Sequence, residues 1–190
     1  MSATVLSMSM SLDGFIAGPN ETMEQGLGEG GERLHEWAFR GEESGVNREM
    51  IDEFMSTGAV VAGRGTFEPA AGWGGDHHDG VPIFILSRHA APDWAAGWPL
   101  VRYVSDLGEA LQAAKDAAGE KDVLVHGAGI AQRALASGLL DEIQIHLIPV
   151  LLGQGRRLFD HLPSEHIELE RVRVLEGATG VTHLRYRVRR

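Results

Sequence analysis

Four short stretches of the chain each combine glycine with a hydroxyl or charged side chain, directly after an apolar run. Glycine lets the backbone approach a ligand closely, and hydroxyl, carboxylate and guanidinium groups supply polar contacts. In open parallel sheets, ligands lie at the carboxyl ends of the strands, so these stretches predict one shared binding edge. They are SLDGFIAG (11–18), GRGTFE (63–68), SRHA (87–90) and HGAGIAQ (126–132).

The stretch 126–132 has the composition of an anion-binding turn. Gly127 and Gly129 leave room for an oxyanion, and the helix predicted to follow offers free N–H groups and a positive dipole end. The string reads G-x-G-x-x-Q, so it lacks the third glycine of the classical dinucleotide fingerprint. A tight strand-to-helix turn without a ligand is the alternative.

Two further strand ends carry arginines. In 63–68, Gly63 ends the strand, Thr66 can cap a helix, and Arg64 projects from the loop, while Ser87 and Arg88 follow the next strand. A guanidinium group binds phosphate through two parallel hydrogen bonds. Either arginine alone is compatible with a solvated side chain. Together they predict an anion at this edge of an acidic protein.

Asp13 stands between the first strand and Gly14. A carboxylate at this place can hydrogen-bond a heterocycle or relay a proton in catalysis. It can equally cap the glycine turn, as Asp does in many loops. The sequence favours the catalytic role and leaves the turn role open.

The remaining chemistry-bearing stretch is GGDHHDG (74–80). Metal sites use His and Asp, but adjacent His77 and His78 are expected to point apart, so we expect a solvated loop and no metal. Trp73 either lines a pocket or packs in the core. The sequence has no nucleophile elbow, Walker loop or His-Glu-x-x-His motif. This excludes the common classes of hydrolase and nucleotide-hydrolysing enzyme.

Composition narrows the class of partner. Seventeen Lys and Arg against 27 Asp and Glu give a net charge of −10, which disfavours binding to nucleic acid or to an anionic membrane surface. No cysteine is present, so disulfides and thiolate chemistry are excluded. The first residues do not have the pattern of a signal peptide. We therefore expect a cytoplasmic protein that binds a small molecule.

The order of elements predicts an α/β fold. Leu6, Met8 and Met10 alternate with serines, which indicates a strand, and a helix with Asn47 as N-cap is predicted over 47–58. Strands over 59–63, 82–86, 100–105 and 122–126 alternate with helices over 106–119 and 131–138. The segments 166–177 and 181–190 predict an antiparallel hairpin. We expect one domain over 1–190, with a mostly parallel central sheet and this hairpin at its edge.

The quoted stretches, with PIFILSR and GLLDEIQIHLIPVLLGQGRRLF, resemble the dihydrofolate reductase-like superfamily. The closer resemblance is to the reductase domain of bacterial riboflavin biosynthesis, and it runs from about residue 3 to the C-terminus. It implies the three-layer dihydrofolate reductase-like fold and an NADPH-dependent oxidoreductase. Hydride would pass to a pterin- or pyrimidine-like heterocycle, as in the phosphoribosylaminouracil reductase of that pathway.

The resemblance also assigns residues by position. Asp13 would lie at the nicotinamide end. The cofactor residues are Gly63, Arg64 and Thr66 for the adenosine side and phosphates, Ser87 and Arg88 for the 2′-phosphoribose, Gly127, Ala128, Gly129 and Ile130 for the pyrophosphate, and Ala17 and Gly18 over the nicotinamide.

Two departures from the family concern the substrate side. His126 stands where the riboflavin reductases usually have an acid, and only Asp52 or Glu53 could supply the acid that grips a pteridine. A non-catalytic NADPH-binding module and a true dihydrofolate reductase are therefore the alternatives. The resemblance also implies a homodimer, which we expect to use the apolar segment 141–152, although that segment could be a central strand of one subunit.

Overall fold

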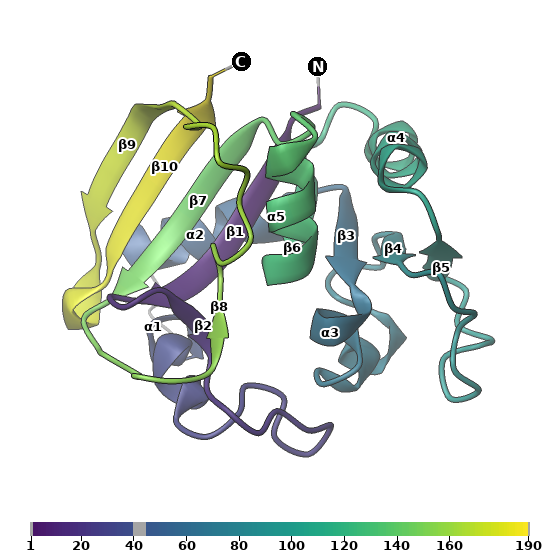
Figure 1. Ribbon diagram of the computed structural model, residues 1–190, viewed down its shortest axis with the longest axis horizontal. Helices are drawn as coiled ribbons and strands as arrows, with labels where there is room; N and C mark the ends of the chain where they lie inside the picture. Colours follow the sequence, from purple (N-terminus) through teal and green to yellow (C-terminus); the bar gives the residue numbers. More distant parts are fainter. Residues whose placement is uncertain (1, 40–44, 190) are drawn as a thin grey trace.

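The computed structural model describes residues 2–39 and 45–189, which form one eight-stranded sheet between layers of helices (Figure 1). The strand order is β5-β4-β3-β6-β1-β7-β10-β9. The first six strands in this order are parallel, and β10 and β9 are antiparallel. The bounds are β1 Thr4–Ser11, β3 Ala59–Gly63, β4 Ile83–Leu86, β5 Val101–Val104, β6 Val123–His126, β7 Glu142–Ile148, β9 Leu169–Glu176 and β10 Thr182–Val188. The predicted fold class is confirmed.

Helices cover both faces of this sheet. In Figure 1, α4 (Leu107–Ala118) and α5 (Ala128–Ala136) lie in front of it, and α2 (Val46–Met55) lies behind it. The smaller elements are β2 Phe15–Ala17, β8 Arg156–Arg157, α1 Glu36–Phe39, α3 Arg64–Phe67 and the 3-10 turns Gly31–Leu34, Ala71–Gly75 and Ala178–Gly180. No helix in the described part of the chain is long and apolar enough to cross a membrane.

Strand β1 has two different buried faces. Leu6 and Met8 belong to the core cluster formed with α4 and α5. Ser7 and Ser9 point to the opposite face, where Ser7 Oγ lies 3.2 Å from His146 Nε2 and Ser9 Oγ accepts a hydrogen bond from Trp37 Nε1. Alternation predicted the strand, and these buried partners explain why its second face is polar.

The start of α2 differs from the prediction. The helix follows Gly45 without a side-chain cap, and Asn47 lies inside its first turn, 1% exposed. The Oδ1 atom of Asn47 lies 3.0 Å from His183 Nε2 on β10. The prediction of Asn47 as N-cap is wrong because its amide pairs with a residue far along the chain. The predicted cap Asp106 is confirmed, since its Oδ1 accepts from Glu109 N at 2.9 Å.

The apolar segment 141–152 contains a central strand. Strand β7 pairs with β1 on one side and with β10 on the other, and Ile143 and Ile145 are buried in the core. The alternative of a central strand within one subunit is confirmed, and burial there accounts for the apolar character of β7. The use of segment 141–152 in association stays a prediction. Homodimer formation itself stays a prediction.

Candidate functional site

The four predicted stretches lie along one edge of the sheet, because β4, β3, β6 and β1 are successive neighbours in it. The turns after β3 and β6 are in direct contact. A Cβ atom at Gly127 would collide with the Thr66 hydroxyl, and the φ angle of Gly127 is +102°. Only glycine fits both the backbone conformation and the space at this junction.

The start of α5 offers hydrogen-bond donors to open space. Ala128, Gly129 and Ile130 form its first turn, and no side chain caps it. A Cβ atom at Gly129 would have no neighbour within 4 Å. Unpaired N–H groups at the positive end of a helix dipole form a ready anion site. The pyrophosphate of a dinucleotide fits the residues present here.

The two arginines differ in their availability. Arg64 Nε donates to Glu68 Oε1 at 2.7 Å, and this hydrogen bond raises the pKa of Arg64. Ser87 Oγ bonds to the backbone of His89, closing a turn on itself. Arg88 is exposed and, within residues 2–39 and 45–189, makes no hydrogen bond or ion pair in the structure. Arg88 is therefore free to meet a phosphate, while the charge of Arg64 is already compensated.

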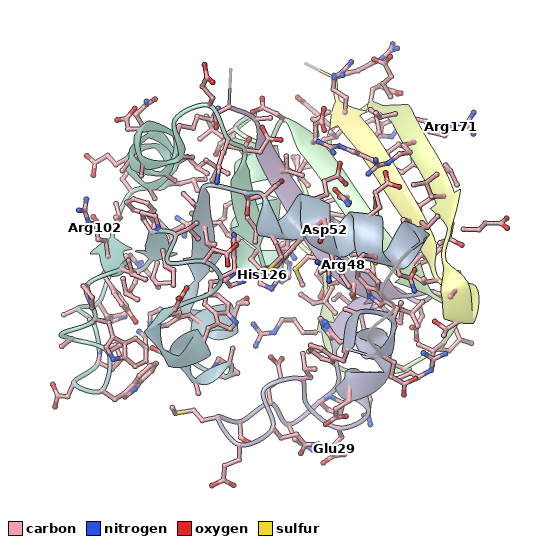
Figure 2. All side chains as sticks on the ribbon, turned by 180° about the vertical axis from the view of Figure 1, so that it is seen from behind. Glu29, Arg48, Asp52, Arg102, His126 and Arg171 are labelled. Carbon is pink, nitrogen blue, oxygen red and sulfur yellow. The ribbon has the colours of Figure 1, made fainter. Side chains whose placement is uncertain are left out.

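The remaining predicted cofactor residues lie around the same edge. Gly63 ends β3, and a Cβ atom there would meet nothing within 4 Å. Ala17 lies in β2 and lines the cavity described below. Gly18 N donates to Leu27 O at 2.8 Å, and a Cβ at Gly18 would collide with the backbone of Glu29, on the loop labelled in Figure 2.

Asp13 has the contacts of an anchoring residue. Its carboxylate accepts from Ser11 Oγ at 2.6 Å and from the backbone N–H groups of Leu152 and Gly153 at 3.1 and 2.7 Å. The Ser11 hydrogen bond and these backbone donors lower its pKa to about 2. Asp13 is ionised at neutral pH, holds no proton to donate, and does not line the cavity. Its catalytic role stays a prediction.

A cavity of about 590 Å³ lies beside this edge, on the serine face of β1. Its apolar wall comes from α1, α2, the loop before α1 and the turn around Trp73, and Thr66 also lines it. Thus the cavity adjoins the turn that contacts Gly127. The apolar and aromatic lining residues are Met8, Ile16, Ala17, Leu27, Trp37, Ala38, Phe39, Ile51, Phe54, Met55, Ala70 and Trp73.

Four histidines line the same cavity: His35, His77, His126 and His146. They come from separate segments, and Figure 2 shows His126 near the middle of the molecule. The sequence drew attention to His126 and His77 only. A cluster assembled across 111 positions leaves no local spacing signal, which is why His35 and His146 were missed.

Burial keeps these imidazoles uncharged. It lowers the pKa of His35 to about 4, and burial together with the nearby His35 and His78 lowers the pKa of His126 to about 4. Burial, with His126 and His78 nearby, lowers the pKa of His77 to about 2, and burial beside His183 holds that of His146 well below 6.5. In the described part of the chain, His126 Nδ1 and His35 Nε2 are buried without a hydrogen-bond partner. Both nitrogens are covered by the protein itself, so the cavity is lined by other atoms of these two histidines.

A buried hydrogen-bond chain fixes the orientation of His146. Its Nδ1 lies 2.8 Å from His183 Nδ1, and His183 Nε2 lies 3.0 Å from Asn47 Oδ1. Because that oxygen only accepts, His183 carries its proton on Nε2 and accepts at Nδ1. His146 then donates from Nδ1 and accepts at Nε2 from Ser7 Oγ. The Ser7 oxygen consequently presents a lone pair, and no free proton, to the cavity.

One ion pair closes the far side of the cavity. Arg156 Nε donates to Glu21 Oε1 at 2.8 Å, and Arg156 Nη1 donates to the Gly65 carbonyl at 2.5 Å. Burial raises the pKa of Glu21, although Arg156 acts in the opposite direction. This pair joins the loop after β2 to the start of α3.

The histidine-rich loop differs from the prediction. His78 is 5% exposed, its Nε2 lies 3.1 Å from Thr57 Oγ1, and its Nδ1 lies 2.7 Å from His77 Nδ1. The prediction that the two histidines point apart is wrong, because tertiary packing places both against Phe54 of α2. The rest of the loop is solvated as predicted, since Asp76, Asp79 and Gly80 are exposed. Among the described residues, no group of three or more His, Cys, Asp or Glu could hold a metal ion.

Neither acid on α2 lines the histidine-lined cavity. Asp52 pairs with Arg48 at 2.6 Å, and Figure 2 shows both residues on α2. Glu53 pairs with Arg185 at 2.7 Å and also with Arg173. Glu53 lines a separate cavity of about 460 Å³, shared with Asp122, near the amino ends of β1 and β6. The prediction that one of these acids grips a pteridine has no support in this geometry.

Comparison with known proteins identifies relatives of this fold. The model of the RibD C-terminal domain matches residues 3–183. A candidate riboflavin biosynthesis protein from Shewanella sp. PV-4 has 23% identity and a TM-score of 0.73, with 99% of each chain covered. A pyrimidine reductase-like protein from Corynebacterium diphtheriae has 14% identity and a TM-score of 0.68, covering 100% of this chain and 92% of that one.

A dihydrofolate reductase from Enterococcus faecalis, complexed with NADP(H), has 14% identity and a TM-score of 0.61 over 99% of this chain and 97% of that one. These TM-scores show that the proteins share a fold. No curated protein is significantly similar in sequence to the chain.

Proposed function

The chain belongs to the RibD C-terminal domain family, and from that premise we propose that it is an NADPH-dependent reductase acting on a pterin- or pyrimidine-like heterocycle. The observation that carries the proposal is the contact between two features. The turn at Gly127 starts the uncapped helix α5, and the Thr66 side chain touching it also lines the histidine-lined cavity. An anion site and a ring-sized cavity therefore adjoin.

Different residues of the site would bind different parts of the cofactor. The N–H groups at the start of α5 would hold the pyrophosphate, and Arg88 with Ser87 would meet the 2′-phosphate. Ala17, which lines the cavity, would lie near the nicotinamide. NADPH supplies the hydride when it is bound. The chain itself contributes orientation and exclusion of water, which are large contributions to such a reaction.

The neighbouring structures support this proposal to different extents. The dihydrofolate reductase from Enterococcus faecalis shares the fold and holds NADP(H). The RibD protein of Acinetobacter baumannii is longer, and this chain spans 59% of it at 18% identity and a TM-score of 0.64. A riboflavin precursor is therefore one class of substrate that the proposal includes.

Calorimetric titration with NADPH and NADH tests the cofactor half. We expect NADPH to bind more tightly than NADH, by about tenfold or more, because Arg88 meets an additional phosphate. NADPH oxidation is then followed with pterins, ribosylaminopyrimidines, flavin precursors and dihydrofolate. Binding of neither nucleotide would overturn the proposal.

A second candidate function is a non-catalytic NADPH-binding module. Asp13 is ionised, and Glu21, the one carboxyl group lining the cavity within the described ranges, is tied to Arg156. The site thus lacks a ready carboxylic acid as proton donor. NADPH binding without oxidation across the whole set of heterocycles would favour this candidate.

Association is proposed separately. The structure leaves homodimerisation open on surfaces other than the edges of β7, which are both paired. We expect sedimentation at micromolar concentration to show a dimer, and a single 20.6 kDa species would contradict it.

A further inference from the structure

We infer that Asn47, which does not itself line the histidine-lined cavity, is a positioning residue that fixes the Ser7 hydroxyl as a hydrogen-bond acceptor. The cavity then selects a ligand that presents an N–H or amino group to Ser7. The inference deepens the proposed function, on which it rests for treating that ligand as the hydride acceptor. It is carried by a buried chain of hydrogen bonds that runs from Asn47 to the wall of the cavity.

This hydrogen-bond chain joins four separate elements of the fold, namely α2, β10, β7 and β1. Asn47 Oδ1 lies 3.0 Å from His183 Nε2, and the Nδ1 atoms of His183 and His146 are 2.8 Å apart. His146 Nε2 lies 3.2 Å from Ser7 Oγ. Ser7 and His146 line the cavity, whereas Asn47 and His183 do not. Three hydrogen bonds therefore link a residue outside the cavity to a hydroxyl in its wall.

A hydrogen-bond chain through uncharged imidazoles has only two possible directions. Each uncharged ring has one N–H group and one bare nitrogen, so a ring that accepts on one side must donate on the other. Burial, with Arg173 nearby, lowers the pKa of His183 to about 4, and burial beside His183 holds that of His146 well below 6.5. Both rings are uncharged at neutral pH, so the group at one end of the hydrogen-bond chain decides the polarity at the other end.

The Asn47 end of the hydrogen-bond chain is enclosed by protein. A Cβ atom at Gly177, in the turn between β9 and β10, would collide with both Asn47 Oδ1 and His183 Nε2. The Trp37 ring packs against both imidazoles, with centroid distances of 4.3 Å to His146 and 4.9 Å to His183. The amide oxygen that faces His183 can only accept, so the direction is set at this end. The serine at the other end must then give its proton to His146.

A hydroxyl whose proton is committed in this way recognises hydrogen-bond donors. The Ser7 oxygen can accept from a ligand, but it can donate only by breaking its hydrogen bond to His146. That would leave a buried acceptor on His146 without a partner, which is unfavourable. A ring N–H or amino group is therefore favoured beside Ser7 over a ring oxygen or an unprotonated ring nitrogen.

Nitrogen NMR of the isotope-labelled, ligand-free protein at neutral pH reads the direction of the hydrogen-bond chain, because protonated and unprotonated ring nitrogens have well separated chemical shifts. We expect His146 to be protonated at Nδ1 and His183 at Nε2. In Asn47→Leu the terminal acceptor is lost, so both rings should exchange tautomers, with His146 protonated at Nε2 and His183 at Nδ1. The exchanged tautomers in the native protein, or unchanged tautomers in Asn47→Leu, would overturn the inference.

A matched pair of ligands reads the polarity of Ser7 without NADPH. Indole and benzofuran have the same bicyclic shape, but indole has an N–H group where benzofuran has an oxygen. Calorimetric titration should show indole binding about fivefold more tightly, which is the effect expected of one neutral hydrogen bond. Equal or tighter binding of benzofuran would overturn the inference, and so would the absence of indole binding.

Variants separate this effect from a general loss of structure. Both Ser7→Ala and Asn47→Leu should abolish the preference for indole, and Asn47→Leu should change the ratio no further when Ser7 is already replaced. Gln144→Leu is the matched control, because it removes another buried amide, one that donates to Glu53 instead. A preference that survives Ser7→Ala, or that is lost equally in Gln144→Leu, would overturn the inference. If Asn47→Leu does not fold, the native tautomers and the Ser7→Ala ratio decide it.

The outcome is separable from that of the proposed function. NADPH binding by a protein with the exchanged tautomers would leave the reductase proposal standing and remove this inference. The expected tautomers and the indole preference, in a protein that binds neither nucleotide, would support the role of Asn47 while removing the reductase proposal.

Discussion

The edge at the strand ends, where we propose that the cofactor binds, and the histidine-lined cavity lie side by side but are built in different ways. The edge consists of contiguous turns such as 63–66 and 126–130, in which neighbouring residues make the site. The cavity is lined by histidines from four distant segments and by the serine face of β1. A binding site made by backbone geometry is thus visible in short motifs, whereas one made by burial is not.

The two regions also differ in what sets their chemistry. At the edge, the polar groups are helix N–H groups and the exposed side chain of Arg88. In the cavity, burial changes the histidines from groups that titrate near neutral pH into uncharged hydrogen-bonding groups. The following predictions test this division, from the largest expected effect to the smallest.

Acidification should act through the cavity and strongly destabilise the protein. The folded-state pKa of His35 and of His126 is about 4, below the ordinary 6.5, so the unfolded chain binds more protons between these values. Stability is therefore lost as pH falls from about 6.5 toward about 4, by on the order of 2–3 kcal/mol for each histidine. Thermal melting at about pH 7 and pH 5 measures the effect.

The variant His126→Gln sharpens this experiment, since a neutral side chain should flatten part of the pH dependence. A melting temperature that is the same at both pH values would contradict the assignment of uncharged histidines to the cavity.

Substitution at the edge should separate two neighbouring glycines. Gly127→Ala places a methyl group against Thr66 at φ +102°, so we expect the free energy of unfolding to fall by about 2–4 kcal/mol. Gly129→Ala lies in α5 with open space around it, so stability should stay equal or rise by about 0.5–1 kcal/mol. Urea denaturation compares the two.

Gly129→Ala should nevertheless weaken NADPH binding by about tenfold, because its methyl group enters the space proposed for the pyrophosphate. Unchanged NADPH affinity in this variant would remove the pyrophosphate from the start of α5.

The two arginines should differ in cofactor selectivity. Arg88→Gln should reduce the preference for NADPH over NADH by about tenfold, since a charge-assisted hydrogen bond at an exposed site is screened by water and salt. Arg64→Gln should reduce it less, because Glu68 already pairs with that guanidinium. Titration of both nucleotides at two salt concentrations measures the ratio, and added salt should weaken NADPH selectively. A larger effect from Arg64 would reverse this assignment.

Asp13→Asn should have the smallest effect on the fold. The lowered pKa means that the ionised carboxylate stabilises the folded state above about pH 4, and this stabilisation is lost as pH falls through about 2. An amide cannot accept all three hydrogen bonds, so we expect a melting temperature a few degrees lower and NADPH affinity unchanged. Turnover that falls while melting is unchanged would assign Asp13 to catalysis. Turnover that survives in the folded fraction would show that Asp13 serves only to anchor the loop at residues 152–153.

The sequence by itself determined the order of strands and helices, the shared edge at the strand ends and the α4 cap at Asp106. These features follow from alternation, glycine punctuation and local hydrogen bonds, all of which act over a few residues. The resemblance to a family extended them to a cofactor. The antiparallel hairpin was predicted for the same local reason.

Only the tertiary structure decided which of these residues are free to act. It paired Arg64 with Glu68, turned Asn47 toward His183, buried His78 against Thr57 and enclosed β7 between two strands. Each outcome depends on which distant segment packs against the residue. The type of a residue and its neighbours in the sequence do not specify that segment. The cavity is the clearest case, because packing both assembles its histidines and removes their charge.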